Sequence, residues 1–511
     1  MNTVSFQSVS ELLFSKCLEN PTKDFILFED KAGLIESLNY KSFEIKVKQL
    51  GSVLLSNGIQ KGDKVLLHLP NGIDFTISWF AILSIGAVMV PTNILSTKEE
   101  IEYLVSHSES QLIITEKEFE EKFLNFKHLP LLYSRLKDGQ GGKSLDKEME
   151  QSVLLDYFPT LSSNDEAAIL YTSGTTSKPK GVVLTHRNYL HTGEKMAERL
   201  NLTSSDRTLI VLPMFHGNGQ YYLAMPALYA GASIAIAEQF SATNYIKQAK
   251  RMGATVGSLF SAPIKMILKK DYDPEDADNS LRLIIYAQSI TDQQYKDFTT
   301  RYNTPLRQLY GMTETIAVPL INSLNGLNDS TSIGEEACGY KVKLRNDKGE
   351  EVKDGEEGEI TVFGIPGETI MKEYYKNEQE TAKAIQFNWL YTGDIARKDP
   401  LTGLFYFVDR KKDMMKRSGE NIAAGEVESV INDHEAVFES AVISLPDPIY
   451  EESIHAFIIL KENTTVTEEE IIHWCQQRLA KFKIPQAVYI VKEFPRTSVG
   501  KIQKQQLKTW I

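Results

Sequence analysis

The chain has 511 residues, which is too long for a single hydrophobic core and predicts roughly three or four globular units. Apolar residues make up 42% and charged residues 24%, as is typical of soluble globular proteins, so disordered, collagen-like and coiled-coil classes are excluded. The formal net charge of -12 argues against nucleic acid as the main partner.

The cysteines and the apolar runs predict a cytoplasmic protein without a membrane span. Cys17, Cys338 and Cys475 are too few and too widely spaced for a disulfide framework or a zinc site. Residues 1–17 lack a basic start and a long apolar core, so we expect no signal peptide. The longest uncharged run, residues 75–93, is interrupted by polar side chains and predicts a buried helix followed by a strand.

The first part of the chain alternates helical patterns with short apolar, β-branched runs, which predicts layered α/β structure. A hydroxyl-rich loop at 171–181 follows, and a helix is expected to begin at Thr185-His186-Arg187-Asn188. The predicted strands lie at 64–69, 87–90, 111–114, 208–212, 233–236 and 281–286.

The pattern changes from Gly334 onward, where short strands with glycine turns predict a small β subdomain. A polar boundary at 409–413 precedes the C-terminal unit, so we predict domains at 1–409 and 410–511. In the second domain we expect a helix near 425–432, strands at 440–445 and 454–460, and a helix opened by a Thr467/Glu470 capping box.

The loop at 171–181 has the composition of a phosphate-binding loop. It carries hydroxyl side chains, two glycines and two lysines directly after an apolar run at 167–170. Glycine lets the backbone approach an anion closely, hydroxyls donate hydrogen bonds and lysine supplies charge. It is not a Walker loop, because no Gly-Lys-Ser/Thr follows the required spacing. A flexible surface loop would share the composition, but not the Lys178-Pro179-Lys180-Gly181 segment that leads into the next apolar run.

Three further motifs follow this loop in order along the chain: residues 310–315 (Tyr-Gly-Met-Thr-Glu-Thr), 391–394 (Tyr-Thr-Gly-Asp) and 495–502 (Pro-Arg-Thr-Ser-Val-Gly-Lys-Ile). Together the four motifs resemble the adenylate-forming superfamily, and the chain resembles an acyl-CoA synthetase over nearly its whole length. One motif alone would be weak evidence for this superfamily, whereas four motifs in the same order and spacing are specific to it. The resemblance implies a large N-terminal domain of layered α/β subdomains with a small β subdomain, and a small mobile α+β C-terminal domain.

The resemblance also implies ATP and coenzyme A as substrates, Mg²⁺ as the metal and a small carboxylic acid as the group activated. Tyr310 would stack on adenine, Glu314 would hold Mg²⁺, and Lys501 would be the catalytic cation together with Thr313 and Glu314. The ATP and AMP site would comprise Thr172, Ser173, Gly174, Thr175, Thr176, Lys180, Gln288, Tyr310, Gly311, Met312, Asp394 and Arg410.

Two other groups of residues are assigned by the same resemblance. Members of the superfamily rotate the C-terminal domain between the two half-reactions, and Lys412 stands at the hinge position. The acyl pocket would comprise Phe215, His216, Tyr221 and Tyr222, and the CoA site Gly419, Glu420 and Lys483.

Simpler structural explanations exist for single residues. Glu314 could cap a helix, Asp394 could be a turn residue, Lys501 could be a solvated terminal lysine, Lys483 could belong to a solvated basic patch and His216 could simply be packed. At the spacing of the family the explanations for Glu314, Asp394 and Lys501 are jointly improbable, whereas those for Lys483 and His216 stay open. The chain also departs from the family: Ser177 replaces a common glycine, and the segment around Gln288 lacks the usual glycine pair, so we assign Gln288 backbone contacts only.

The motifs outside the acyl pocket are closest to those of carnitine/crotonobetaine-CoA ligases, at 364–367, 372–374, 407–410 and 419–421. A trimethylammonium substrate favours an aromatic cage or a carboxylate. Tyr221 and Tyr222 could supply rings, but residues 213–226 contain no Asp or Glu. A medium-chain, long-chain or aryl acid therefore remains an alternative substrate.

Other acceptors and activities also remain open. Amino-acid-activating relatives place an aspartate directly after the Phe of the pocket motif, but Phe215 is followed by His216-Gly217-Asn218, so an α-amino acid is not expected. No carrier domain is expected within the chain, although loading of a separate acyl carrier protein is possible. A non-catalytic nucleotide sensor and a luciferase-like oxygenase are the alternatives of other classes. The oligomeric state is not predicted.

Overall fold

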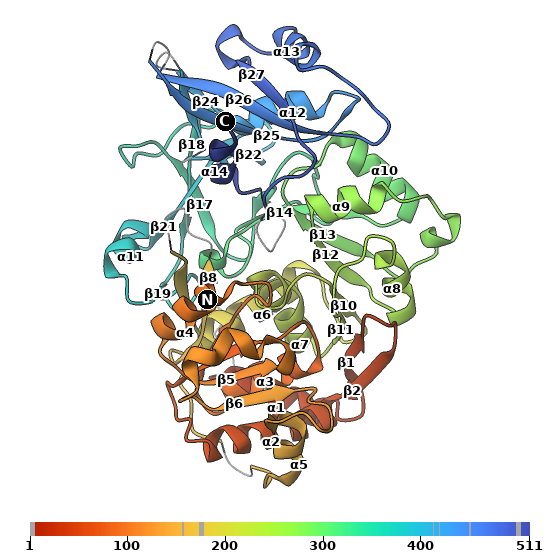
Figure 1. Cartoon of the computed structure of the whole chain (residues 1–511), viewed down its shortest axis with the longest axis vertical. Helices are drawn as coiled ribbons and strands as arrows, with labels where there is room; N and C mark the ends of the chain where they lie inside the picture. The colour runs from red at the N-terminus through yellow and green to blue at the C-terminus, as the bar shows by residue number, and fades with distance from the viewer. Residues whose placement is uncertain are drawn as a thin grey trace. The chain divides into compact units, whose positions relative to one another are not determined.

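The computed structural model describes residues 6–155, 158–172, 178–411, 413–417, 420–448, 451–496 and 502–511, with the backbone alone at 420 and 421 (Figure 1). The chain divides into two compact units, residues 1–342 with 362–390 and residues 343–361 with 391–511. None of the helices in these described ranges is both long and apolar enough to cross a membrane.

An eight-stranded sheet in the first unit carries the predicted phosphate loop. Its strand order is β19-β9-β8-β4-β3-β5-β6-β7, parallel from β8 to β7 and antiparallel at β8, β9 and β19. Helices on both faces bury the parallel strands, which explains their continuous apolar runs. The strands are β3 (Lys64–His68), β4 (Val88–Pro91), β5 (Ser110–Glu116), β6 (Leu131–Ser134), β7 (Lys143–Ser144), β8 (Glu166–Thr172), β9 (Lys180–Thr185) and β19 (Glu373–Tyr374).

A nine-stranded sheet forms the rest of the first unit's framework. Its order is β16-β15-β14-β13-β12-β10-β11-β1-β2, with a parallel centre and antiparallel edges. The strands are β1 (Asp24–Glu29), β2 (Ile35–Asn39), β10 (Arg207–Ile210), β11 (Ser233–Ala237), β12 (Val256–Phe260), β13 (Leu283–Ala287), β14 (Leu306–Tyr310), β15 (Leu320–Ile321) and β16 (Glu335–Glu336).

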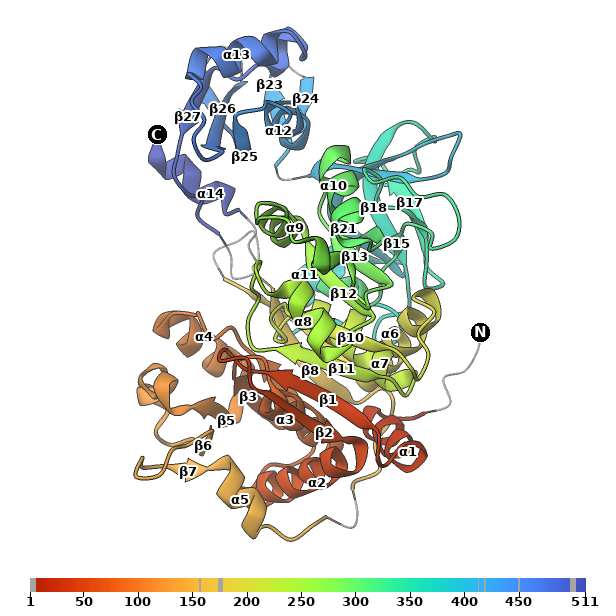
Figure 2. The ribbon, with the colours of Figure 1, turned by 90° about the vertical axis from the view of Figure 1, so that its right-hand side faces the viewer.

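Helices of the first unit pack on these sheets, and Figure 2 shows α8, α9 and α10 beside β12 and β13. Tyr245 and Met252 of α8, Ile264 of α9 and Phe298 of α10 join one buried cluster with the strands. The α-helices are α1 (Val9–Glu19), α2 (Tyr40–Ser56), α3 (Ile73–Ser84), α4 (Lys98–Ser108), α5 (Leu145–Gln151), α6 (His186–Arg199), α7 (Met225–Tyr229), α8 (Tyr245–Met252), α9 (Ser261–Leu268), α10 (Asp292–Tyr302) and α11 (Glu378–Ala384).

Local sequence signals explain how individual elements begin. The uncharged run at 75–93 forms α3 and β4, as predicted. The helix predicted at Thr185 is α6, and the Thr185 hydroxyl accepts a hydrogen bond from the Asn188 backbone N–H at 3.2 Å. The Asn188 side chain accepts from the Thr185 N–H in return, which completes a capping box.

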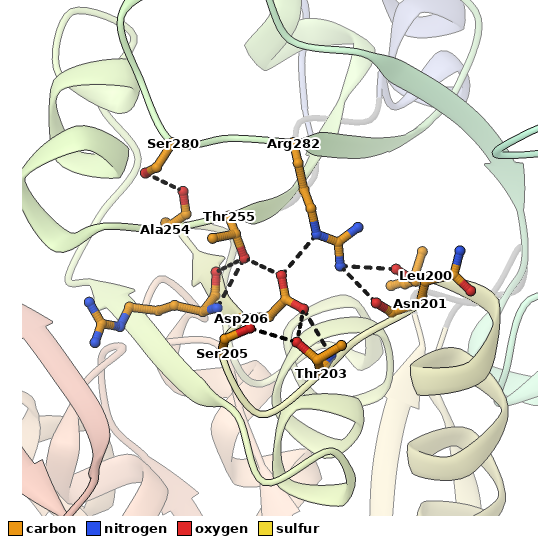
Figure 3. A network of polar contacts seen from close by, with 10 residues as sticks. Leu200, Asn201, Thr203, Ser205, Asp206, Ala254, Thr255, Ser280 and Arg282 are labelled. Carbon is orange, nitrogen blue, oxygen red and sulfur yellow. Dashed lines mark hydrogen bonds and ion pairs between the residues drawn. The ribbon is translucent and has the colours of Figure 1, made fainter.

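Three neighbouring strands of the nine-stranded sheet are tied together at their starts by a buried carboxylate, Asp206 (Figure 3). Asp206 precedes β10 and accepts hydrogen bonds from the Thr255 hydroxyl before β12 at 2.7 Å and from the Arg282 Nε before β13 at 2.8 Å. The Thr203 backbone N–H donates to its second oxygen at 2.8 Å. Burial alone would raise the pKa of Asp206, but these donors hold it below its ordinary value.

The second unit contains most of a five-stranded sheet and a smaller α+β part. The five strands run β17-β18-β21-β20, with β22 beside β21. The helix opened by the Thr467/Glu470 capping box is present as predicted. β20 (Ile385–Gln386) of the five-stranded sheet belongs to the first unit. The other elements of the sheet and of the α+β part are β17 (Lys341–Arg345), β18 (Glu357–Phe363), β21 (Trp389–Lys398), β22 (Phe405–Arg410), β23 (Met415–Arg417), β24 (Glu420–Ile422), α12 (Ala424–Asn432), β25 (Val437–Asp447), β26 (Glu451–Leu460), α13 (Glu468–Gln476), β27 (Ala487–Ile490) and α14 (Lys504–Leu507).

The predicted fold class is therefore confirmed, with layered α/β structure in the larger N-terminal part and α+β structure in the smaller C-terminal part. The division into compact units assigns 343–361 and 391–409 to the same unit as the C-terminal residues. The predicted domain boundary between residues 409 and 410 lies inside that unit and stays a prediction.

Candidate active site

The antiparallel β8/β9 hairpin holds the two ends of the predicted phosphate loop. Thr172 and Lys180 are register partners across the hairpin. The Lys180 Nζ lies 2.5 Å from Oε2 of Glu380 in α11 and 4.8 Å from the centre of the Tyr374 ring. The remaining predicted loop residues, Ser173, Gly174, Thr175 and Thr176, lie outside the described residues, as does Ser177.

The second predicted motif follows β14, which ends at Tyr310. Thr313–Thr315 form one 3-10 turn, so Thr313 and Glu314 project from a short, rigid segment. Glu314 is buried, and its Oε1 accepts a hydrogen bond from the Tyr374 hydroxyl at 2.8 Å. Tyr374 therefore contacts both Glu314, through its hydroxyl, and Lys180, through its ring.

The ionisation of these groups follows from their contacts. Burial, and then the Glu314 carboxylate, raise the pKa of Tyr374, which keeps its hydroxyl a hydrogen-bond donor. Hydrogen bonds from Lys180 and Lys383 lower the pKa of Glu380 to about 2. Glu380 is thus ionised and paired with Lys180 near neutral pH.

Two of the predicted acyl-pocket residues, Tyr221 and Tyr222, lie next to the same motif. Tyr221 and Tyr222 are buried in a one-turn π-helix, Asn218–Ala224. A Cβ added at Gly311 would lie 2.5 Å from the Tyr222 hydroxyl, so this close approach requires glycine. The Phe215 and His216 rings lie against each other, with centroids 4.2 Å apart.

Two buried polar atoms in this π-helix have no hydrogen-bond partner among the described residues. They are the Tyr221 hydroxyl and the Asn218 Oδ1. The Asn218 amide nitrogen donates to the Ser258 hydroxyl at 2.9 Å, which fixes the orientation of the side chain. Because buried polar groups are normally paired, these two atoms are candidates to contact a bound molecule.

Gln288 follows β13 and is exposed, with a backbone φ of 69°. This left-handed conformation favours glycine and costs a non-glycine residue on the order of 1 kcal/mol. The conformation explains why a glycine suits this part of the chain, and the assignment of backbone contacts to Gln288 stays a prediction.

In the second unit, Asp394 and Arg410 are register partners on β21 and β22. The Arg410 Nε lies 3.7 Å from the Asp394 Oδ1. Glu359 of β18 contacts the residues next to this pair, because it accepts hydrogen bonds from the Gly393 backbone N–H at 2.9 Å and the Lys411 Nζ at 3.1 Å. Glu359 belongs to none of the predicted sites.

The predicted CoA and hinge residues are only partly described. Lys483 forms an ion pair with Glu426 at 2.7 Å, and Glu420 belongs to β24, where only its backbone is described. Lys412, Gly419 and Lys501 lie outside the described residues. The roles of these residues stay predictions.

Comparisons with known proteins define the class of protein to which this fold and these motifs belong. The AMP-binding enzyme profile matches residues 14–375, and the profile of the AMP-binding enzyme C-terminal domain matches residues 426–501. The chain belongs to the AMP-binding enzyme family, and within it to the adenylate-forming acyl-CoA ligases, which use ATP and CoA.

Individual relatives narrow this class. The chain is 36% identical over 496 residues to a crotonobetaine/carnitine-CoA ligase of Salmonella heidelberg, covering 95% of this chain and 96% of that protein. The corresponding Citrobacter koseri ligase is 37% identical over 499 residues, with the same coverage. Among solved structures, the O-succinylbenzoate coenzyme A synthetase of Bacillus subtilis in complex with AMP is 26% identical with a TM-score of 0.85, covering 97% of this chain and 98% of that one.

Tyr374 and Glu380, the side chains that connect the motifs, belong to none of the predicted sites. Tyr374 lies in a segment whose sequence indicates only kinship with the carnitine/crotonobetaine-CoA ligases, but it pairs with β9 and contacts Glu314 directly. Glu380 carries no motif of its own. No local pattern could have paired it with Lys180, because the two are 200 residues apart.

Proposed function

We propose that this ligase activates a small acid of the carnitine or crotonobetaine kind with ATP and transfers the acyl group to CoA. The single observation that carries the choice of acid is the 36–37% identity to crotonobetaine/carnitine-CoA ligases over 95% of the chain. The unpartnered Tyr221 hydroxyl and Asn218 Oδ1 support a polar acid rather than a plain hydrocarbon chain.

In the first step, an oxygen of the substrate carboxylate attacks the α phosphorus of ATP, and pyrophosphate leaves with the electron pair of the broken P–O bond. Negative charge accumulates on phosphate oxygens, so fixed cations and donors lower the barrier. We assign this role to Lys180, Thr313 and Lys501. Tyr310, Gly311 and Met312 would hold the adenine side of AMP, and Asp394 with Arg410 the ribose.

In the second step, the CoA thiol attacks the acyl carbon and AMP leaves with the electrons of the acyl–oxygen bond. Lys501 would block the path of the thiol, so we assign Lys412 as the hinge of a domain rotation between the steps. Gly419, Glu420 and Lys483 would then contact CoA. The ion pair of Lys483 with Glu426 would have to open for this contact.

Glu314 is suited to hold Mg²⁺. Its buried carboxylate offers the hard oxygen that Mg²⁺ prefers, and Tyr374 donates to one of its oxygens. Among the described residues no group of three or more His, Cys, Asp and Glu could hold a metal by itself, which suits an ion that shares its ligands with substrate phosphates. When bound, Mg²⁺ would neutralise charge on the phosphates of ATP.

An aryl acid is the second candidate substrate. Trp79, Tyr189 and Tyr221 form a buried series of rings, with centroids 5.5 Å and 6.0 Å apart along the series. Aromatic rings next to a substrate suit a flat aromatic acid as well as a quaternary ammonium group. The Tyr189 hydroxyl donates to Gln220 at 2.6 Å, so this ring is already fixed.

The test is CoA-dependent AMP release by the wild-type protein across a panel of carnitine, crotonobetaine, γ-butyrobetaine, C4 to C16 fatty acids and aryl acids. We expect the betaines to give the highest kcat/KM, and Tyr221→Phe to lower kcat/KM for carnitine more than for butyrate. A higher kcat/KM for an aryl or fatty acid would overturn the choice of acid. AMP release that never depends on CoA would indicate a carrier protein as the acceptor.

A further inference from the structure

Two buried side-chain amides, those of Asn71 and Gln220, hold both polar backbone groups of one residue, Met214. The Met214 N–H donates a hydrogen bond to the Asn71 Oδ1 at 2.7 Å. The Met214 carbonyl accepts a hydrogen bond from the Gln220 Nε2, also at 2.7 Å. All three residues are buried, so water does not compete for these bonds. The two hydrogen bonds together are called the Met214 clamp below.

Asn71 connects the clamp to both large sheets of the first unit. It lies between β3 and α3, and its Nδ2 donates to the carbonyl of Leu212, after β10, at 3.1 Å. The same nitrogen lies 3.3 Å from the carbonyl of Ala237, at the end of β11. Strand β3 belongs to the eight-stranded sheet, whereas β10 and β11 belong to the nine-stranded sheet. The position of Met214 is therefore fixed relative to both sheets.

Gln220 connects the clamp to the π-helix and to α6. It lies in the π-helix Asn218–Ala224, and its Oε1 accepts a hydrogen bond from the Tyr189 hydroxyl of α6 at 2.6 Å. Among the described residues, neither Asn71 nor Gln220 has a buried side-chain nitrogen or oxygen without a partner. Both amides are thus occupied by protein groups, and they act on the reaction through the backbone that they hold.

The clamped residue belongs to a turn that carries two predicted acyl-pocket residues. The His216 N–H donates to the Pro213 carbonyl at 3.2 Å, which closes a turn with Met214 and Phe215 at its centre. The turn belongs to neither sheet, so buried side chains have to supply the partners of the Met214 backbone groups. Loss of the clamp would therefore free the turn to move, together with the rings of Phe215 and His216.

The chain directly after the turn packs closely on a third predicted pocket residue, Tyr221. A Cβ added at Gly217 would lie 2.5 Å from the Tyr221 ring, so this approach requires glycine. The Tyr221 hydroxyl is buried without a partner among the described residues, which makes it a candidate to contact a bound molecule. A shift of the turn would therefore also reach Tyr221.

We propose that Asn71 and Gln220 are positioning residues that determine which acid this ligase accepts. The inference rests on the proposed function, which assigns Phe215, His216 and Tyr221 to the acyl pocket. With the clamp in place, the turn presents these rings to the acid in one arrangement. The predicted ATP-binding residues are held instead by β14 and by the β8/β9 hairpin, so we expect the clamp to affect the acid and not ATP.

The test is steady-state kinetics of Asn71→Ala and Gln220→Met with the acid that the wild type uses best, well below the unfolding temperature of each variant. We expect the KM for this acid to rise about tenfold, as for the loss of one buried hydrogen bond, and the KM for ATP to stay within about twofold of wild type. The ratio of kcat/KM between the best and the poorest accepted acid should fall, because a mobile turn discriminates less.

Asn279→Ala is the matched control for Asn71→Ala. The Asn279 Nδ2 donates to the carbonyls of Asp276 at 2.9 Å and Tyr302 at 2.8 Å, and its Oδ1 accepts from the Leu281 N–H at 2.9 Å. Asn279 thus makes the same kinds of backbone contact as Asn71, but none of them to a residue of the predicted sites. Its loss should lower the midpoint of thermal unfolding and leave the KM for the acid unchanged.

An unchanged KM for the acid in the clamp variants would overturn the proposal. An equal rise in the KM for the acid and for ATP would overturn it as well, because the amides would then support the fold in general. If one variant does not fold, the other still tests the clamp, since both amides hold the same residue. A wild-type preference for an aryl or fatty acid would refute the proposed choice of acid alone, because the variants are then compared with that acid.

Discussion

Two polar networks of the first unit use similar residues for different purposes. In the Asp206 network (Thr203, Asp206, Thr255 and Arg282), the carboxylate binds donors that are fixed at strand starts. In the Lys180 network (Lys180, Glu314, Tyr374 and Glu380), the cation is a flexible lysine that a phosphate could take over. The difference indicates that several donors converging on one buried carboxylate stabilise the fold, whereas an exchangeable ion pair prepares a binding site.

The largest expected effect comes from removing the charge of Glu314. Glu314→Gln should lower kcat/KM about 10²- to 10³-fold, because the buried carboxylate acts on charge that develops in the transition state. The midpoint of thermal unfolding should stay close to wild type, since the amide oxygen can still accept from Tyr374. Steady-state kinetics and thermal melts check both parts, and full activity would remove Glu314 from the reaction.

Asp206→Asn should lower the stability of the fold and leave the activity of the folded enzyme unchanged. Arg282 and Thr255 would lose a charged acceptor, and we expect the free energy of unfolding to fall by about 2 kcal/mol, a value already discounted because the Arg282 side chain is 38% exposed. The kcat measured well below the unfolding temperature should be near that of wild type. Urea unfolding gives the first value, and an unchanged free energy would show that the network is not structural.

The same aspartate predicts a difference in acid stability. The pKa of Asp206 in the folded protein is below its ordinary value of 3.8, so its contribution is complete above that pH and is lost as the pH falls through the lower, folded-state pKa. Urea unfolding of wild type and Asp206→Asn should therefore converge below pH 3.8. If the free energies of unfolding of the two proteins differed by the same amount at every acidic pH, the lowered pKa of Asp206 would be contradicted.

The two networks also show how far the sequence can predict the structure. Caps such as Thr185/Asn188 and Thr467/Glu470 join residues three apart, so local patterns predict their helices. The Asp206–Arg282 and Lys180–Glu380 contacts span 76 and 200 residues, and depend on sheet order that no local pattern reveals. The motifs therefore nominate residues for the chemistry, but they do not predict the side chains that contact those residues.

Tyr374→Phe tests how the Glu314 carboxylate is positioned without changing any charge in the Lys180 network. Loss of the hydroxyl removes one hydrogen bond to a buried carboxylate, so we expect kcat/KM to fall about tenfold and half-maximal activity to require more Mg²⁺. Tyr375→Phe is the neighbouring control, since its hydroxyl contacts the exposed Glu109 at 3.2 Å. An unaltered Mg²⁺ dependence in Tyr374→Phe would leave this tyrosine with a packing role only.

Glu380→Gln should change the kinetics least among these variants, and it is the only variant expected to bind ATP more tightly than wild type. Without the Glu380 carboxylate, Lys180 has no ion pair to break when it binds the phosphates of ATP. The KM for ATP should therefore fall about two- to threefold. Glu378→Gln, two residues earlier in α11 and exposed, should behave as wild type. A higher KM for ATP in Glu380→Gln would mean that Glu380 orients Lys180 rather than competing for it.

The central claim is that this chain forms an acyl-adenylate and passes the acyl group to CoA. Mass spectrometry of a single-turnover mixture of enzyme, ATP, Mg²⁺ and the best acid of the panel tests it most directly. We predict that acyl-AMP accumulates without CoA and converts to acyl-CoA and AMP when CoA is added. Formation of ADP with an acyl phosphate, or turnover of ATP without any acyl-AMP, would contradict the account.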